Sequence, residues 1–277
     1  MRYTTNDNSI KVLDKTEFNP QQILECGQVF RYRKTDDGYQ VISTDKRANI
    51  VEKKDYYIIY TNDVRYFEQY FDLHTDYRLI KLKLNQHECM QKPIQYGAGI
   101  RLLKQNIFEM IVSFIISANN NIPRIQKSIE ALCEKFGTKC GDYYAFPTLS
   151  QLSKGSIEDF KTAGLGYRAE QLHKTLKMLK FINLEQMRTY TYEDKKKFLL
   201  SLSGVGEKVA DCILLFAYNE MSSFPVDTWI AKSYKAIFGS DETNRAKMRQ
   251  ALYEKFGALS GYAQQYIFYY YRDNKLS

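Results

Sequence analysis

Residues 199–212 restrict the fold of this chain more than any other part of its sequence. They read as the end of one apolar helix, a tight turn containing Gly204 and Gly206, and the start of a second apolar helix. Glycine adopts backbone conformations that other residues avoid, so the two helices can follow each other closely. The second helix then points its unpaired N–H groups outward, where a phosphate group can bind. The segment therefore predicts a helix-hairpin-helix that holds a nucleic-acid backbone without reading its bases.

Two residues associated with this hairpin are able to carry chemistry. Lys208 falls in the first turn of the second helix, and Asp227 follows in the sequence Phe-Pro-Val-Asp-Thr. Each has an ordinary interpretation when taken alone, because most lysines are solvated and an aspartate before a helix usually caps it. Together they would place an amine and a carboxylate in one site, which a protein that only binds DNA does not need.

The hairpin, Lys208 and Asp227 resemble the helix-hairpin-helix superfamily of DNA glycosylases, in its bifunctional, lysine-bearing branch. Four further blocks are similar to the 8-oxoguanine DNA glycosylase/lyase family and occur in that family's order. They are residues 27–31 (GQVFR), 117–124 (SANNNIPR), 164–169 (GLGYRA) and 262–264 (YAQ). The resemblance covers nearly the whole chain.

The resemblance implies a role for both chemical groups. Lys208 would attack C1′ of the damaged nucleotide, for which its amine must be neutral at the moment of reaction. Asp227 would stay ionised and stabilise the cationic sugar that develops as the base departs. Once a Schiff base joins Lys208 to C1′, the sugar opens, and loss of its 2′ proton permits β-elimination of the 3′ phosphate. One lysine thus supplies a glycosylase step and a lyase step.

An enzyme that excises a base from duplex DNA must first take that base out of the stack. The resemblance places the flipped base between Cys212 and Phe268, with its Watson–Crick edge against the amide of Gln264. Phe216 follows Cys212 by one helical turn and can line the same pocket. The backbone carbonyl of Gly27 would accept the N7 proton that distinguishes 8-oxoguanine from guanine. Without the resemblance, Cys212 and Phe216 read as core residues and Gly27 as a turn residue.

The opposite strand has its own set of expected contacts. The resemblance places Tyr167 as a wedge in the gap that the flipped base leaves. It assigns Arg124, Arg168 and Asn119 to the orphaned cytosine, and Asn120 belongs to the same block. Two guanidinium groups suit the O2 and N3 acceptors of cytosine. Phosphate binding or a solvated surface is the alternative interpretation for either arginine alone.

The DNA backbone would contact the hairpin glycines, Gly204 and Gly206. A further phosphate contact in the family often comes from a histidine two residues beyond the catalytic aspartate. This chain has Trp229 there. A neutral indole can donate one hydrogen bond or stack, so the contact would differ in kind.

Composition narrows the partners and the compartment. The formal net charge of +8 favours an anionic partner but does not separate nucleic acid from an acidic membrane surface. No apolar run approaches the roughly 20 residues of a spanning helix, and the polar start is unlike a signal peptide. Five scattered cysteines are typical of free thiols in a reducing compartment. We expect a cytoplasmic monomer that binds double-stranded DNA, with no membrane partner, no metal and no organic cofactor.

The pattern of apolar residues changes along the chain. Residues 20–62 are β-rich, with strands predicted at 29–32, 39–42 and 56–60 and a turn at 36–38. Residues 66–84 are irregular and helical, and 93–99 look like a connection. Helical spacing begins at residue 107, continues through 123–136 and recurs to the end of the chain. These patterns predict an α+β protein, with an antiparallel sheet domain at 1–105 and a helical domain at 106–277.

The function expected from these observations is excision of 8-oxoguanine, preferably opposite cytosine, followed by cleavage of the DNA strand. One alternative is a related glycosylase that prefers another base. The other is a hairpin protein that binds DNA without catalysis, for which Lys208 and Asp227 together would have no use.

Overall fold

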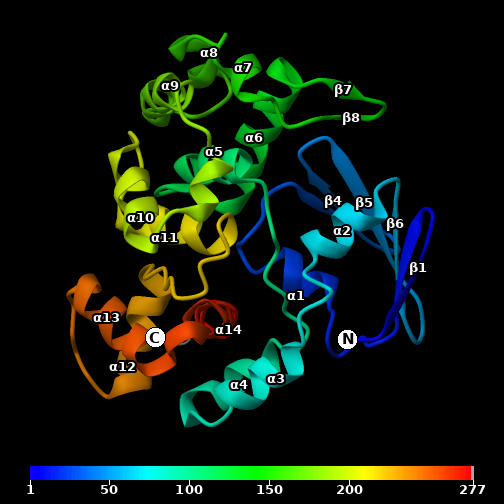
Figure 1. Ribbon diagram of the computed structural model, residues 1–277, viewed down its shortest axis with the longest axis vertical. Helices are drawn as coiled ribbons and strands as arrows, with labels where there is room; N and C mark the ends of the chain where they lie inside the picture. The colour runs from blue at the N-terminus through cyan, green and yellow to red at the C-terminus, as the bar shows by residue number, and fades with distance from the viewer. Residues whose placement is uncertain (276–277) are drawn as a thin grey trace.

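The computed structural model describes residues 1–275 and begins with an antiparallel sheet of six strands (Figure 1). The order across the sheet is β1-β2-β6-β5-β4-β3. Helices α1 (Pro20–Leu24) and α2 (Val64–Tyr70) share one apolar core with the sheet. The strands are β1 (Tyr3–Asn6), β2 (Ser9–Val12), β3 (Tyr32–Thr35), β4 (Gly38–Ser43), β5 (Lys46–Glu52) and β6 (Tyr57–Thr61).

The sheet agrees with the sequence prediction in its centre and differs at its ends. β4 contains the strand predicted at 39–42, β6 matches the strand predicted at 56–60 with a shift of one residue, and the predicted turn joins β3 to β4. The strand predicted at 29–32 is wrong, because β3 begins only at Tyr32. β1 and β2 lie before the region that the pattern marked as β-rich.

The side chain of Gln28 keeps residues 27–31 in a loop. Gln28 is fully buried, and its Nε2 donates to the carbonyl oxygens of Ile23 at 2.9 Å and Arg101 at 2.8 Å. Its Oε1 accepts from the backbone N–H of Leu103 at 2.9 Å. A buried amide needs such partners, and two of the three, Arg101 and Leu103, lie more than 70 residues away. The loop is therefore fixed by contacts that a local pattern does not contain.

The two helices that follow the sheet pack against the C-terminal part of the chain. They are α3 (Tyr77–Leu84) and α4 (Glu88–Tyr96). α4 continues through Pro93, so the connection predicted at 93–99 begins later than expected. Leu84, Met90 and Ile100 share a core with buried residues of the last three helices. Packing thus crosses the boundary predicted at residue 105, which stays a prediction.

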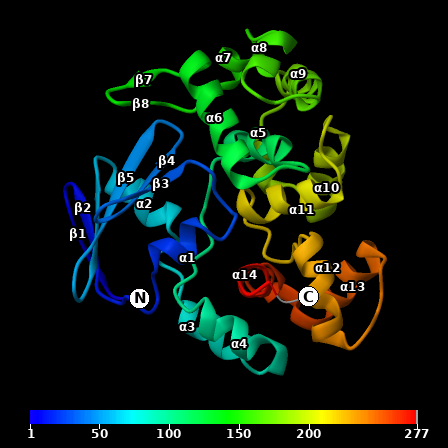
Figure 2. The same ribbon diagram turned by 180° about the vertical axis from the view of Figure 1, so that it is seen from behind.

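The remaining described residues are mostly helical, as predicted. Nine of the eleven residues of α5 are buried, and this helix lies among the others (Figures 1 and 2). A small hairpin, β7 (Lys139–Cys140) with β8 (Tyr143–Tyr144), interrupts the helices where an all-helical chain was predicted. Gly141 turns this hairpin with a φ of +70°. The helices are α5 (Ile107–Ser117), α6 (Ile122–Phe136), α7 (Leu149–Leu152), α8 (Ile157–Thr162), α9 (Arg168–Leu179), α10 (Tyr192–Ser201), α11 (Glu207–Phe216), α12 (Thr228–Phe238), α13 (Arg245–Phe256) and α14 (Ser260–Asp273), with 3-10 turns η1 (Gln186–Thr189) and η2 (Gly257–Leu259). The fold is α+β.

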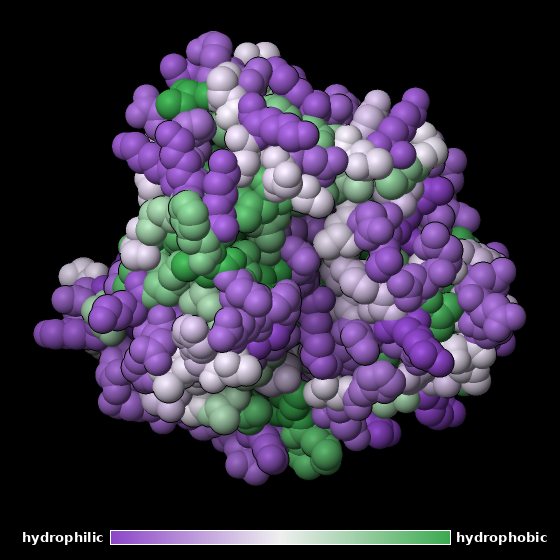
Figure 3. All heavy atoms as spheres, turned by 45° about the horizontal axis from the view of Figure 1, so that its top comes forward, coloured by the Kyte–Doolittle hydropathy of each residue, from purple (hydrophilic) through white to green (hydrophobic). Residues whose placement is uncertain are grey.

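The face of the molecule drawn in Figure 3 is largely hydrophilic. Figure 3 shows a limited area of hydrophobic residues left of its centre, with hydrophilic residues around it. Within residues 1–275, no helix combines the length and the hydropathy that crossing a bilayer requires.

Candidate active site

The hairpin between α10 and α11 has the form that the sequence predicts. Gly204 has a φ of +87°, and Gly206 is the N-cap of α11. A β-carbon on Gly204 would lie 3.0 Å from the side chain of Gln171 on α9, so the turn is tight as well as left-handed. Because Gly206 has no side chain, it leaves the first N–H groups of α11 to an outside acceptor such as phosphate.

Lys208 lies over an aromatic floor. Its Nζ is 5.7 Å from the centre of the Phe114 ring on α5. Phe216 stacks on Phe114 with 5.7 Å between the ring centres, and Phe30 meets Phe114 edge-on at 5.6 Å. Both Phe216 and Phe30 are buried. The floor therefore combines α5, α11 and the loop of the sheet half, and it surrounds one side of the amine with apolar rings.

Cys212 lies one helical turn beyond Lys208 and belongs to the same site. Burial raises the pKa of the Cys212 thiol to about 11, whereas the nearby charge of Lys208 lowers it. The carboxylate of Asp227 also acts on this thiol and raises its pKa. The thiol is thus protonated at neutral pH. An amine, a thiol and a carboxylate from two helices converge here.

Asp227 caps the helix that follows it, as an aspartate in this position is expected to do. Its Oδ1 accepts a hydrogen bond from the backbone N–H of Ile230 at 2.9 Å. Burial raises the pKa of Asp227 above its ordinary value, while the cap hydrogen bond and the charge of Lys208 lower it. The hydroxyl of Ser223 donates to the carbonyl of Asp211 at 3.0 Å and ties the approach to α12 onto α11. The cap hydrogen bond after Asp227 and the Ser223 hydrogen bond before it therefore fix the segment that carries the carboxylate.

Helix α14 closes onto the loop that contains Gly27. The backbone of Gly27 has a φ of +81°, and a β-carbon there would lie 3.2 Å from the ring of Phe268. Gln265 donates to the carbonyl oxygen of Cys26 at 2.6 Å. Arg272 donates at 2.8 Å to the carbonyl two residues before Gly27. Two hydrogen bonds and one ring contact thus fix this loop against the end of the chain.

The side chain of Gln264, on the same helix, has an unpaired hydrogen-bond acceptor within residues 1–275. It precedes Phe268 by four residues, so the two side chains lie on one face of α14. Gln264 is 4% exposed, and within residues 1–275 its buried Oε1 has no hydrogen-bond partner. Buried acceptors are normally paired. The unpaired oxygen is therefore available to a donor on a bound ligand.

The residues expected on the opposite strand gather where α5, α6 and α9 meet. Tyr167 is 57% exposed, and its hydroxyl lies 3.4 Å from the carbonyl of Ala118. Asn119 is exposed with a φ of +50°, and Arg124 is exposed in the first turn of α6. Asn120 donates to the carbonyl of Ile116 at 3.1 Å, which ends α5. The tip of the α5–α6 loop and Tyr167 thus project together.

Arg168 has a different setting from Arg124. It is 6% exposed, and its guanidinium group donates to the carbonyl oxygens of Ala118 and Asn119, each at 2.8 Å. The same group lies 4.5 Å from the ring centre of Tyr167. Arg168 therefore holds the α5–α6 loop against the start of α9, whereas Arg124 faces solvent.

Comparison with known proteins assigns both halves of the chain. Residues 11–111 match the model for the 8-oxoguanine DNA glycosylase N-terminal domain, and residues 112–258 match the HhH-GPD superfamily base excision DNA repair protein. This chain belongs to the 8-oxoguanine DNA glycosylase family. Membership confirms the resemblance inferred from the motifs and makes the chain an N-glycosylase/DNA lyase.

The glycosylase is similar to solved and curated proteins over much of its length. The 8-oxoguanine glycosylase/lyase of Clostridium acetobutylicum, solved with double-stranded DNA containing cytosine opposite 8-oxoG, is 36% identical with a TM-score of 0.94, and 99% of each chain is covered. A probable N-glycosylase/DNA lyase of Methanothermobacter thermautotrophicus is 30% identical over 76% of this chain and 74% of its own length. A 3-methyladenine DNA glycosylase of Archaeoglobus fulgidus is 19% identical, covers 98% of this chain and 99% of its own, and has a TM-score of 0.75, which shows a shared fold only.

The sequence of this glycosylase does not reveal a buried group of charges beside α11. Asp211, which precedes Cys212, is fully buried and forms ion pairs with Lys196 of α10 and Arg249 of α13. Glu207 pairs with both cations, at 3.0 and 3.2 Å. The group joins α10, α11 and α13 around the helix that carries Lys208. Its only sequence signal is an aspartate inside an apolar helix.

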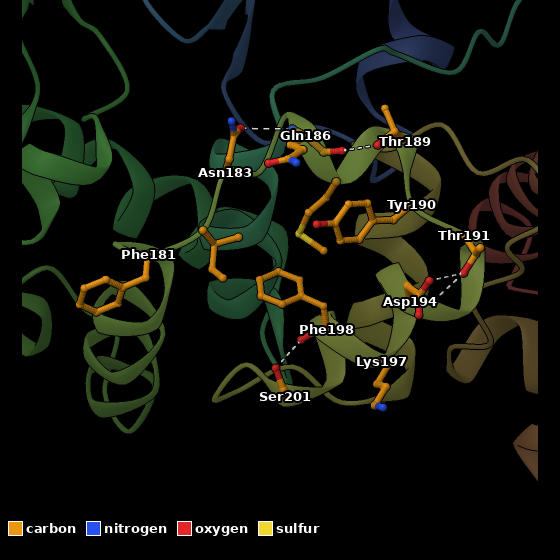
Figure 4. Close-up of a pocket in the computed structure, with 12 residues that line it drawn as sticks. Phe181, Asn183, Gln186, Thr189, Tyr190, Thr191, Asp194, Lys197, Phe198 and Ser201 are labelled. Carbon is orange, nitrogen blue, oxygen red and sulfur yellow. Dashed lines mark hydrogen bonds between the residues drawn. The ribbon is translucent and has the colours of Figure 1, made fainter.

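Cavity size alone does not locate the site of this glycosylase. A groove of about 850 Å³ lies between the segment after α9 and helix α10 (Figure 4). Its walls include Phe181, Tyr190 and Phe198. The residues expected to bind DNA or the base all lie outside its lining, so chemistry and not volume identifies the candidate site.

The described residues of the glycosylase offer no metal site. Among residues 1–275, no three His, Cys, Asp or Glu side chains are grouped so that they could hold a metal ion. All five cysteines are free thiols, and Cys212 is the one placed beside Lys208.

Proposed function

We propose that this chain excises 8-oxoguanine from duplex DNA, preferably opposite cytosine, and then cleaves the strand through a Schiff base on Lys208. The observation that carries the proposal is the convergence of Lys208, Cys212 and Asp227. Lys208 lies over the ring of Phe114, which also meets Phe30 of the loop that contains Gly27. The loop that would test the base thus shares an aromatic floor with the amine that would attack its sugar.

The chemistry begins at the amine of Lys208. Its neutral Nζ forms a bond to C1′ as the bond from C1′ to the base breaks, and the base leaves with the bonding electrons. The carboxylate of Asp227 stabilises the positive charge that develops on the sugar. Opening of the sugar ring gives the imine. Loss of a 2′ proton then expels the 3′ phosphate, and water releases Lys208 from the product.

Recognition of the base uses both sides of the pocket. The Gly27 carbonyl would accept the N7 proton of 8-oxoguanine, which guanine lacks. The Watson–Crick edge of the same base presents N–H donors, and the unpaired Oε1 of Gln264 supplies an acceptor for them. Phe268 and Cys212 supply the two faces between which the ring system would lie.

The opposite base is tested at the tip of the α5–α6 loop. Tyr167 would fill the gap in the stack, and the exposed Arg124 would donate to cytosine. Adenine presents an N6 donor and greater bulk, so it fits this arrangement less well. Arg168 keeps the loop in place through the carbonyls of Ala118 and Asn119.

The remaining parts of the proposal concern its setting. We propose that the glycosylase acts as a monomer on cellular DNA in the cytoplasm. Five unbridged cysteines suit a reducing compartment. Gly204, Gly206 and Trp229 would contact phosphates, and the reaction would need no metal or organic cofactor.

The test is a set of matched duplexes that each carry one modified base: 8-oxoguanine, hypoxanthine, 3-methyladenine or uracil. We expect strand cleavage at 8-oxoguanine, and borohydride should trap the protein on that strand. Lys208→Gln should bind the duplex without trapping or cleavage, whereas Lys197→Gln on the exposed face of α10 should behave as the parent. Cleavage at another base with 8-oxoguanine intact would replace the proposed substrate. Trapping of Lys208→Gln would remove the lysine from its role.

A further inference from the structure

A basic groove lies at the C-terminal end of the molecule, outside the candidate active site. It has a volume of about 820 Å³ and is lined by α4, α12, the end of α13 and the end of α14. Figure 2 shows α14 above α4 and to the left of α12. Four lysines from three helices line it, namely Lys92, Lys232, Lys235 and Lys255, together with Tyr270 and Tyr271.

The charge of this groove is poorly compensated. Glu88 is the one carboxylate among the lining residues. Lys235 pairs at 2.8 Å with Asp241, which lies outside the groove. Among residues 1–275, Lys92, Lys232 and Lys255 take part in no ion pair. Three ammonium groups thus face one carboxylate, which creates a positive potential suited to a polyanion.

The groove starts at a position already assigned to DNA. Lys232 follows Trp229 by three residues on α12, and its Nζ lies 5.1 Å from the centre of the Trp229 ring. Trp229 occupies the first turn of the helix that Asp227 caps. Lys235 lies a further turn along the same helix. A strand that passes Trp229 therefore meets Lys232 next and then the rest of the groove.

We propose that this groove binds the phosphates of duplex DNA beyond the lesion and so extends the contact surface of the enzyme. The proposal rests on the function proposed above. Lysines distributed over three helices fit a chain of phosphates better than a single small anion, because each ammonium group can neutralise a separate charge. Lys232 also supplies a cation near Trp229, where the family often has a histidine.

The test compares two triple variants with the same loss of charge. The groove variant is Lys92→Gln, Lys232→Gln, Lys255→Gln. The control variant is Lys34→Gln, Lys53→Gln, Lys54→Gln, three exposed lysines of the sheet half. Affinity is measured over a series of salt concentrations for duplexes of about one and about three helical turns. Each duplex carries a central tetrahydrofuran abasic analogue, which fixes the register and resists cleavage.

We expect the groove variant to lose affinity on the long duplex, with the slope of log K against log salt reduced by about 0.9 for each phosphate contact removed. The control variant should keep the parent slope. On the short duplex the control variant should bind like the parent, and the groove variant should lose only the contact of Lys232, so its slope should change less than on the long duplex. The proposal is overturned if the groove variant keeps the parent slope on the long duplex, or if the control loses as much. Cleavage of 8-oxoguanine duplexes by the parent protein tests the proposed function separately, so the two failures are distinct.

Discussion

The ring of Phe268 lies where a side chain on Gly27 would begin. A β-carbon built on Gly27 would be 3.2 Å from Cε1 of that ring and would sit on a backbone with a φ of +81°. Glycine is therefore the residue that fits this conformation and this contact at position 27, and the ring of Phe268 is positioned by the same contact.

Gly27→Ala should lower the rate of 8-oxoguanine excision by displacing Phe268 and the neighbouring carbonyl. The left-handed conformation should cost about 1–2 kcal/mol of stability besides. Gly239→Ala is the matched control, because Gly239 has a φ of +65° and open space around it. It should show the stability loss alone. Single-turnover excision and urea unfolding measure the two effects, and equal excision by both variants would contradict the role of Gly27.

Asp227→Asn should separate catalysis from stability. Asparagine caps helices as well as aspartate does, so the hydrogen bond to Ile230 can remain. Loss of the negative charge should slow excision on the order of 100-fold, in the range seen when a transition-state contact is removed. DNA affinity should change little, since the charge acts only in the transition state.

The pKa of Asp227 sets the pH dependence of both properties. Burial raises that pKa in the folded protein, so ionisation at neutral pH opposes folding. Asp227→Asn should be more stable than the parent at pH 7, and the difference should vanish as pH falls below the ordinary aspartate pKa. Excision by the parent should decline as pH falls through the raised pKa. A parent that is the more stable protein at pH 7 would refute this assignment.

The two arginines near the opposite strand should give different phenotypes. Arg124→Ala should reduce the preference for cytosine over adenine opposite the lesion by about 1–3 kcal/mol, the usual size of one good contact. Arg168→Ala should instead free the α5–α6 loop, because its guanidinium group holds the carbonyls of Ala118 and Asn119. It should lower excision opposite both bases and shift the thermal midpoint. Excision rates opposite all four bases provide the measurement, and an unchanged ratio in Arg124→Ala would return that arginine to phosphate binding.

Asp211→Ala should destabilise the protein strongly. It would leave Lys196 and Arg249 without their buried partner, and breaking such a pair costs about 3–5 kcal/mol. Asp241→Ala, which breaks the exposed pair with Lys235, should cost less than about 1 kcal/mol. Urea unfolding followed by circular dichroism distinguishes the two. A loss of similar size in both variants would show that the buried group does not hold α10, α11 and α13 together.

Much of the fold is predictable where spacing decides structure. The apolar period at residues 107–115 predicts α5, and Gly137 ends α6 as expected. The failures involve distant partners. Residues 29–32 have the composition of a strand. Residues 29–31 lie in a loop, however, because the side chain of Gln28 forms hydrogen bonds with the backbone of Arg101 and Leu103. Nothing in the local sequence indicates that the side-chain amide of Gln28 forms hydrogen bonds with a segment more than 70 residues away.

The candidate site also has parts that the sequence predicts and parts that it does not. The spacing of Lys208 and Cys212 places them on one side of a helix, and the sequence before Thr228 predicts that Asp227 caps the next one. The family resemblance adds Gly27 and Phe268. Phe216 is expected in the pocket from its spacing, but the sequence does not reveal the other rings of the floor, because Phe114 reads as one more apolar residue of a buried helix. The hydrogen bonds from Arg168 to the α5–α6 loop are likewise not predictable, because the sequence does not show which acceptors an arginine contacts.

The hydrogen bonds between α14 and the Gly27 loop can form only late during synthesis of the chain. Gln265 and Cys26 are 239 residues apart, and chains that fold as they are made form their N-terminal parts first. The ribosome releases α11, which carries Lys208, before it releases α14, which holds the loop of Gly27. A chain that ended after α13 would contain Lys208 but would lack the helix that holds the loop of Gly27. Until α14 emerges, the loop of Gly27 lacks its hydrogen bonds from Gln265 and Arg272, so the part of the proposed pocket that would test the base is completed last.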